Sequence, residues 1–221
     1  ALEECGYHLA GKGAAANANG KWELDAAIMD GSTRQAGAVA GLKGYKSPIR
    51  IARAVMEKTP HILLVGKGAG QFAESIKATP VKRPKEYYTP SASALAIPGQ
   101  INAGTVGAVA LDINGALASA TSTGGVLNKM PGRVGDSALI GAGTWADERI
   151  AISCTGQGEY FIRAAVTYSS AIEHTFTTTE TSVFGVTTTP INVDTPQSVN
   201  FEFTAGVAPN TFIFGGARWV E

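Results

Sequence analysis

The chain has 221 residues, enough for one large domain or for a domain with an appendage. Hydrophobic residues make up 44% of it, charged residues only 16%, and it contains 27 glycines, which is typical of a globular, sheet-rich protein rather than a disordered one. Its 18 basic and 18 acidic residues cancel, so we expect no nucleic acid and no anionic membrane surface as partners. No apolar run approaches the roughly 18 residues of a membrane helix.

The sequence shows no signal peptide, although it opens at Ala1 rather than at Met, and the cytoplasm is the expected compartment. Two cysteines cannot form a disulfide framework. Cys5 and Cys154 both stand among apolar or small residues, so we expect buried free thiols.

The first half alternates between strand and helix patterns. Ser47 is a plausible helix N-cap, Pro48 suits the first helical position, and Thr59-Pro60 ends the helix. The other expected elements are strands over 24–29 and 36–42, a buried strand over 61–65, and a brief helix over 68–75. A loose segment over 77–104 follows, with prolines at 80, 84, 90 and 98.

The second half begins with a predicted hairpin. Residues 105–112 pair with 116–123 across Ile113-Asn114-Gly115, and Asn-Gly favours a tight primed turn. We then expect a glycine-rich loop over 124–143, a strand over 149–154 and an amphipathic helix over 160–174. The tail, 175–221, is rich in threonine and predicts about three strands. Strands and helices in this order indicate packed α and β layers, an α+β fold.

Thr105 is the residue with the clearest chemical potential. It follows Gly104 at the start of an expected buried strand, directly after the loose segment. Cleavage of the Gly104–Thr105 bond would place an α-amino group beside a hydroxyl, so that one residue supplies both base and nucleophile. On residue type alone, Thr105 would be an ordinary β-branched strand residue.

Charged residues of the following loop suit the two ends of an amino acid. Arg133 can grip a carboxylate bidentately, and Asp136, three residues later, can hold an ammonium group. An isolated pair of this kind would be a surface salt bridge.

A glycine turn, Thr155-Gly156-Gln157-Gly158, follows the last strand of this half and opens a helix. The free N–H groups there could form an oxyanion hole, although an ordinary strand-to-helix turn looks the same. Glu159 suits the first turn of that helix. Thr123 ends the strand that pairs with the Thr105 strand, so hairpin pairing would bring the two hydroxyls together.

The order and spacing of these segments resemble the isoaspartyl peptidase/L-asparaginase family of N-terminal nucleophile hydrolases, the plant-type asparaginases. The second-half segments are Gly104-Thr-Val-Gly-Ala-Val-Ala110, Ala120-Thr-Ser-Thr-Gly-Gly125, Asn128-Lys-Met-Pro-Gly-Arg-Val-Gly-Asp-Ser137 and Ser153-Cys-Thr-Gly-Gln-Gly-Glu159. Those of the first half are Leu2-Glu-Glu-Cys5, Ala10-Gly-Lys-Gly13, Glu23-Leu-Asp-Ala26, Met29-Asp-Gly31, Gly37-Ala-Val-Ala-Gly41, Ala54-Val-Met-Glu57 and Thr59-Pro-His61. The resemblance covers about residues 1–172.

This resemblance implies a set of roles. Thr105, freed by cleavage after Gly104, would attack the side-chain amide of asparagine or of a β-aspartyl peptide, with Thr123 assisting. Arg133 would bind the substrate α-carboxylate and Asp136 its α-amino group, beside Gly158, while Thr155 and Gly156 would stabilise the oxyanion. Catalysis would need no cofactor, and the processed units would pair as a homodimer. A structural sodium ion would lie among backbone carbonyls of the opening loop, those of Leu2, Glu3, Cys5, His8, Ala10 and Lys12.

The implied fold is a four-layer αββα sandwich of the N-terminal nucleophile hydrolase type, here lacking the usual N-terminal strand and the closing C-terminal strands. The hydrolase domain would span 1–174, with 1–104 like the α-subunit and 105–174 like the β-subunit, followed by the β-rich tail, 175–221. Where the family commonly has Phe-Asn-Ala-Gly, this chain has His8-Leu9-Ala10-Gly11. A sandwich short of its outer strands would expose sheet edges.

Two alternatives remain from the sequence. Glycosylasparaginase is a related hydrolase, but its processing site usually has Asp where this chain has Gly104. The chain could also be a non-catalytic remnant, with the hydrolase part as a scaffold and the tail as an interaction module.

Overall fold

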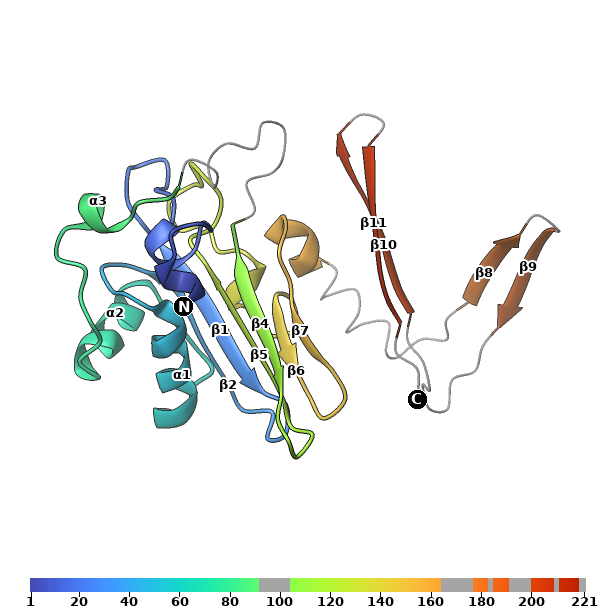
Figure 1. Cartoon of the computed structure of the whole chain (residues 1–221), viewed down its shortest axis with the longest axis horizontal. Coiled ribbons are helices and arrows are strands. Elements are labelled where there is room, and N and C mark those ends of the chain that lie inside the picture. Colours follow the sequence, from blue (N-terminus) through green and yellow to red (C-terminus); the bar gives the residue numbers. More distant parts are fainter. Residues whose placement is uncertain (92–103, 164–176, 183–184, 191–199, 209–210, 219–221) are drawn as a thin grey trace. The chain divides into compact units, whose positions relative to one another are not determined.

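The computed structural model describes residues 1–91 and 104–163 in full, together with the backbone of four strands in the tail (Figure 1). The chain divides into two compact units, an N-terminal one of residues 1–165 and a C-terminal one of residues 166–221. All of the described helices belong to the N-terminal unit.

A five-stranded sheet forms the centre of the N-terminal unit. Its strands are β1 (Leu24–Asp30), β2 (Ala36–Leu42), β3 (Leu63–Val65), β4 (Val106–Leu111) and β5 (Leu117–Thr123), in the order β3-β2-β1-β5-β4. All neighbours are antiparallel except β2 and β3. Because β1 pairs with β5, the sheet joins the sequence before the loose segment to the sequence after it.

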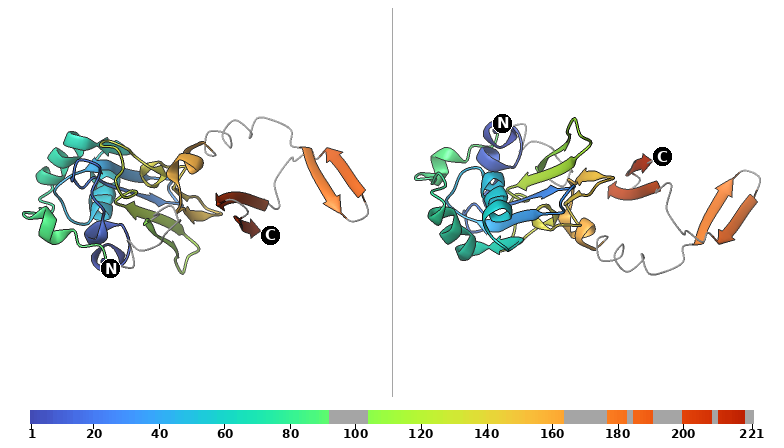
Figure 2. Two further views of the ribbon diagram at one scale, coloured as in Figure 1. Left: turned by 90° about the horizontal axis from the view of Figure 1, so that it is seen from above. Right: turned by 90° about the horizontal axis from the view of Figure 1, so that it is seen from below.

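Helices cover one face of this sheet (Figure 2). Helix α1 (Pro48–Lys58) packs on β2 and β1, and α2 (Gly66–Ser75) packs on β2. The principal core lies between these layers and contains Leu24, Val39, Leu42, Ile51 and Val55, each at most 1% exposed. A short helix, α3 (Pro84–Tyr87), follows.

The other face of the sheet carries a second, smaller sheet. Strands β6 (Thr144–Ala146) and β7 (Ala151–Ser153) form an antiparallel pair that contacts β1, β4 and β5. A smaller core of Met29, Ala36 and Ala146 lies there. The described part of the N-terminal unit therefore has a helix layer and two β layers, which confirms the α+β class; β6 was not predicted.

The start of helix α1 differs from the prediction. Ser47 precedes Pro48 but lies in the left-handed region, with φ at 49°, and its side chain does not cap the helix. Instead, the Glu3 carboxylate accepts a hydrogen bond from the Ile49 N–H at 3.1 Å. A residue far away in sequence thus satisfies a free amide of this helix end, which no local pattern could indicate.

Two strands that we predicted to be buried lie at the sheet edges. Val65 of β3 is 58% exposed, and Leu111 of β4 is 68% exposed. In β4 only Val106 is buried. The predictions for 61–65 and 105–112 were wrong on burial, because apolar composition does not distinguish a central strand from an edge strand.

The remaining elements agree with the predicted sequence positions, with small differences. In the β4–β5 turn only Gly115 has positive φ, so this is not the predicted primed turn, and the Asp112 carboxylate accepts hydrogen bonds from the Asn114 and Ala116 amides. The last helix of this unit begins at residue 158, and its continuation beyond 163 lies outside the described residues.

The C-terminal unit contains two β-hairpins in its described part. Strands β8 (Thr177–Ser182) and β9 (Gly185–Pro190) pair with each other, and so do β10 (Asn200–Ala208) and β11 (Thr211–Arg218). Four strands are described in this unit, where the sequence predicted about three.

The two thiols are less buried than expected. Cys5 is exposed and donates to the Leu2 carbonyl at 3.2 Å, whereas Cys154 is half-buried; both are free. Among the described residues, no helix is long and apolar enough to cross a bilayer.

Gly37 allows the closest contact between the sheet and helix α1. A Cβ at this position would collide with the backbone of Ala52 and Met56 in α1. We expect Gly37→Ala to lower the free energy of unfolding by about 1–3 kcal/mol, because the helix would have to move away. The measurement is urea denaturation. Gly68→Ala in α2 is the matched control: with no atom within 4 Å, it should raise stability by about 0.5–1 kcal/mol. Equal effects of the two substitutions would contradict this packing.

Candidate active site

A small pocket opens where β4 begins and β5 ends. The pairing of Val106 with Ser122 places the preceding residue, Thr105, across from Thr123. The loop after β5 and the turn before the last helix complete the wall. The lining residues are Gly104, Thr105, Thr123, Gly125, Val126, Arg133, Gly135, Asp136, Ser137 and Gly156. The structure thus gathers most of the predicted catalytic and substrate-binding residues in one place. Thr155, which is exposed, and Gly158 do not line the pocket.

The two predicted hydroxyl residues have different partners. The Thr105 Oγ1 atom lies 3.4 Å from the Ser137 Oγ atom. The Thr123 Oγ1 atom accepts a hydrogen bond from the Gly125 N–H at 2.9 Å, which leaves the Thr123 proton free to point elsewhere. Both threonines line the pocket, but their hydroxyls are not hydrogen-bonded to each other.

The opening loop of the chain packs directly behind the Gly104–Thr105 bond. A Cβ at Gly104 would overlap the Leu9 side chain, so only glycine fits before Thr105. The Leu9 carbonyl also accepts a hydrogen bond from the Gly124 N–H at 2.6 Å. Leu9 therefore contacts both chain segments that form this end of the pocket.

The Arg133 guanidinium binds a carboxylate within the chain. Its Nε and Nη2 atoms each donate to one oxygen of Glu159 at 2.9 Å. These bonds lower the pKa of Glu159, and they fix the plane of the guanidinium. Glu159 lies in the first turn of the last helix, as predicted, but its pairing with Arg133 was missed because the two residues are distant in sequence.

Asp136 lines the pocket, and one oxygen of its buried carboxylate is unpaired. The residue is 3% exposed, and its Oδ2 atom has no hydrogen-bond partner among the described residues. Burial raises the pKa of Asp136, and the nearby Arg133 charge opposes that rise. Such an oxygen is costly unless it meets a donor, so it suits a ligand that brings an ammonium group.

Two glycines shape the turn before the last helix, and one of them lets it approach this carboxylate. A Cβ at Gly158 would lie 2.7 Å from Asp136 Oδ1, and Gly156 has φ at 148°, which side chains rarely adopt. Gly158 thus packs on Asp136, whereas Gly156 lines the pocket itself. Of the two residues predicted to form the oxyanion hole, Gly156 is therefore the one that lines the pocket.

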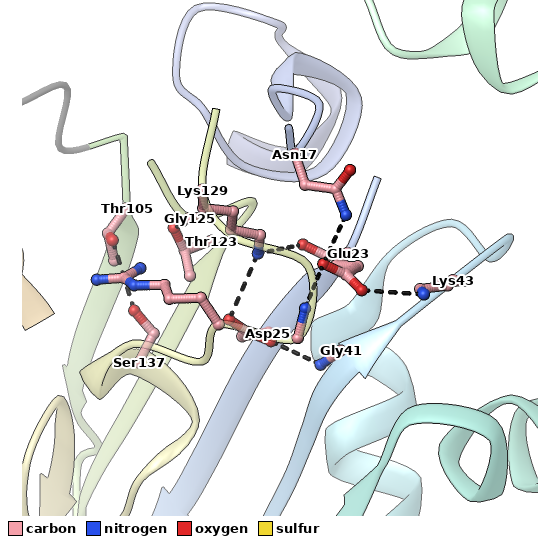
Figure 3. Close-up of polar contacts among 12 residues, drawn as sticks. Asn17, Glu23, Asp25, Gly41, Lys43, Thr105, Thr123, Gly125, Lys129 and Ser137 are labelled. Atoms are coloured by element: carbon pink, nitrogen blue, oxygen red, sulfur yellow. Dashed lines mark hydrogen bonds and ion pairs between the residues drawn. The ribbon is translucent and has the colours of Figure 1, made fainter. Parts of the chain in front are cut away.

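A buried ionic network stands behind the pocket loop (Figure 3). The Lys129 ammonium donates to the Glu23 carbonyl at 2.8 Å and lies 4.0 Å from Asp25 Oδ2. Asp25 also accepts a hydrogen bond from the Gly41 N–H at 2.7 Å. Burial raises the pKa of Asp25 and lowers the pKa of Lys129, while the attraction between the two charges opposes both shifts.

The neighbouring Glu23 carboxylate is fully engaged. Burial disfavours its ionisation, but donors from Asn17, Lys43 and the Gly132 amide outweigh that cost and lower its pKa. Asp25 lies in the apolar strand β1, and a carboxylate in such a strand indicates a buried ionic network. The sequence gives no sign, however, that Lys129 is the partner of Asp25.

The loop predicted to bind sodium forms two 3-10 turns, Leu2–Glu4 and Gly11–Gly13. Four of its predicted carbonyls already accept hydrogen bonds, those of Leu2, His8, Ala10 and Lys12. Each carbonyl oxygen has a second lone pair, and neutral oxygens are suitable ligands for a hard cation. Sodium binding by this loop stays a prediction.

Comparison with known proteins agrees with this geometry. A protein-family model described as Asparaginase matches residues 1–95 and 82–184. The chain belongs to the isoaspartyl peptidase/L-asparaginase family. It is 45% identical over 187 residues to an isoaspartyl peptidase of Escherichia coli, which covers 77% of this chain and 58% of the relative. A human isoaspartyl peptidase/L-asparaginase is 46% identical over 174 residues, covering 74% of this chain and 56% of the relative.

A plant-type L-asparaginase of Pyrococcus horikoshii is 44% identical over 184 residues, covering 75% of this chain and 60% of the relative. The chain thus spans somewhat more than half the length of these family members. The predicted family membership is confirmed.

Lys129 and Asp25 should stabilise the fold only as a pair. Lys129→Met leaves the Asp25 carboxylate buried without its counter-charge, so the free energy of unfolding should fall by about 3–5 kcal/mol. Chemical denaturation measures this loss. The double variant Asp25→Asn, Lys129→Met removes both charges and should recover most of it. A double variant that is no more stable than Lys129→Met would contradict the pairing.

Proposed function

We propose that the chain hydrolyses β-aspartyl amide bonds, in L-asparagine and in isoaspartyl dipeptides, with Thr105 as the nucleophile. The observation that carries this proposal is the position of Thr105 in one pocket with a guanidinium and an unpaired buried carboxylate oxygen. Arg133 and Asp136 offer complementary charges to the two groups on the α-carbon of a free amino acid. The names of the relatives agree with such substrates.

The first step is self-cleavage between Gly104 and Thr105. The Thr105 hydroxyl oxygen attacks the Gly104 carbonyl carbon, the C–N bond breaks, and the hydroxyl proton passes to the departing nitrogen. Water then hydrolyses the resulting ester. The products are a carboxylate at Gly104 and a free α-amino group on Thr105.

The second reaction uses that amino group as the base. It accepts the proton of the Thr105 hydroxyl while the oxygen attacks the side-chain amide carbon of the substrate. The C–N bond then breaks, and ammonia or the amine of the dipeptide leaves with the proton. Water hydrolyses the aspartyl ester, releases aspartate and restores the threonine.

Three groups would hold the substrate and the developing charge. Glu159 uses two of the five N–H bonds of Arg133, so both N–H bonds of Nη1 remain for the substrate α-carboxylate. Asp136 would accept the α-amino group through Oδ2, with Gly158 packed behind it. The amide of Gly156, with the neighbouring Thr155, would stabilise the oxyanion, and Thr123 would assist the nucleophile.

The larger assembly is part of the same proposal. We expect a four-layer αββα sandwich and a homodimer of processed units. A sodium ion in the opening loop would fix Leu9 and the residues around it behind Gly104; no step of the reaction goes through this ion.

Self-cleavage gives the most direct test. The wild-type chain should separate on a denaturing gel into fragments 1–104 and 105–221, and it should release ammonia from asparagine. Thr105→Ala should stay intact and inactive because no oxygen is left to attack. Thr105→Ser is the matched control: it keeps the hydroxyl and should still be cut. An intact wild-type band without ammonia release would instead support the non-catalytic scaffold.

The raised pKa of Asp136 predicts a pH dependence of substrate selection. Asp136 must be ionised to bind an ammonium group, so its contribution is lost as pH falls through its pKa. The ratio of kcat/KM for asparagine to that for succinamic acid, which lacks the α-amino group, should fall about tenfold per pH unit below this pKa. The ratio cancels the titration of the Thr105 amine, which both substrates need. A ratio that does not change with pH would contradict the role of Asp136.

A further inference from the structure

Ser137 is a buried hydroxyl residue of the pocket to which the proposed reaction assigns no role. It lies in a 3-10 turn, Asp136–Ala138, and is 0% exposed. Its Oγ atom lies 3.4 Å from the Thr105 Oγ1 atom. Within the described residues, each of these two hydroxyls is the only side-chain hydrogen-bond partner of the other. The labelled side chains of Thr105 and Ser137 lie close to each other in Figure 3.

The fold holds Ser137 in place from several sides. Its carbonyl accepts a hydrogen bond from the buried Thr144 hydroxyl at 3.2 Å. The turn is closed by a hydrogen bond from the Leu139 N–H to the Asp136 carbonyl at 2.8 Å, and a Cβ at Gly143 would lie 2.8 Å from the Ser137 Cα atom. The Ser137 hydroxyl is therefore positioned before any reaction begins.

A buried hydroxyl must use its proton in a hydrogen bond, and Thr105 Oγ1 is the acceptor that the structure offers. If Ser137 donates to Thr105, the proton of Thr105 must point elsewhere, toward the group that removes it. The same donor stabilises the negative charge that grows on the Thr105 oxygen during attack. A separation of 3.4 Å is long for an O–H···O bond, but catalytic hydrogen bonds often tighten as charge develops.

We propose that Ser137 is a further catalytic residue, which donates a hydrogen bond to the reacting oxygen of Thr105 in both self-cleavage and hydrolysis. This inference rests on the proposed function. It requires Ser137 to affect the rate of attack and not the binding of the substrate α-carbon charges, which belong to Arg133 and Asp136.

The test compares two buried serines of the full chain. Ser137→Ala should slow self-cleavage and lower kcat by about 3- to 10-fold, the rate equivalent of one neutral hydrogen bond, with KM unchanged. Ser119→Ala is the matched control. Ser119 is 1% exposed, and its hydroxyl donates to the Ile152 carbonyl at 2.6 Å, away from Thr105. This control should lose stability on thermal melting but react at the wild-type rate.

A third variant keeps the inference testable if Ser137→Ala does not fold. Ser137→Cys retains a weak donor of similar shape and should react at a rate between those of serine and alanine. Wild-type rates in Ser137→Ala or Ser137→Cys, or equal losses of rate in the Ser119 control, would overturn the inference alone. A wild-type chain that neither cuts itself nor releases ammonia would overturn the proposed function, and the role of Ser137 with it.

Discussion

The ammonium group of Lys129 links the pocket loop to the central sheet. It donates to the carbonyl of Glu23, which directly precedes β1, and lies near the carboxylate of Asp25 within β1. Its stem passes Gly125, where a Cβ would lie 2.7 Å from Lys129 Cδ. Gly125 in turn holds the Thr123 hydroxyl. A buried ion pair gives little net stability, but breaking one is costly, so it favours a single loop position over alternatives. The geometry of the pocket depends on that position, because Arg133, Asp136 and Ser137 all follow in the same loop.

The opening loop fixes the pocket from the opposite side. Glu3 is buried, accepts the Ser122 hydroxyl at 2.6 Å, and also caps helix α1. Burial raises the pKa of Glu3, against the effect of these two donors. Leu9, a few residues later, fills the space that glycine leaves at position 104. The Gly104–Thr105 bond therefore lies between the opening loop and the loop after β5, and contacts with the rest of the fold hold both loops in place.

The sequence predicted what depends on local pattern. The strands at 24–30 and 36–42, the helix after Pro48 and the β4–β5 hairpin each follow from spacing and turn residues, and hairpin pairing alone places Thr105 beside Thr123. The prediction failed where contacts between residues distant in sequence determine the structure. Neither the exposure of β3 and β4, nor the cap from Glu3, nor the pairing of Arg133 with Glu159 leaves a local signal. Ser137 stood in a recognised motif, yet only the structure shows that its hydroxyl meets Thr105.

The pairing of β1 with β5 has a consequence for how a severed chain would behave. Six pairs of opposite residues connect the two strands. Hydrogen bonds from Ser122 to Glu3 and from Lys129 to Glu23 also connect residues before position 104 with residues after it. Scission after residue 104 would interrupt none of them. The two polypeptides would then copurify and migrate as one particle under native conditions. The particle would have gained a C-terminus at residue 104 and an N-terminus at residue 105 without losing either fragment.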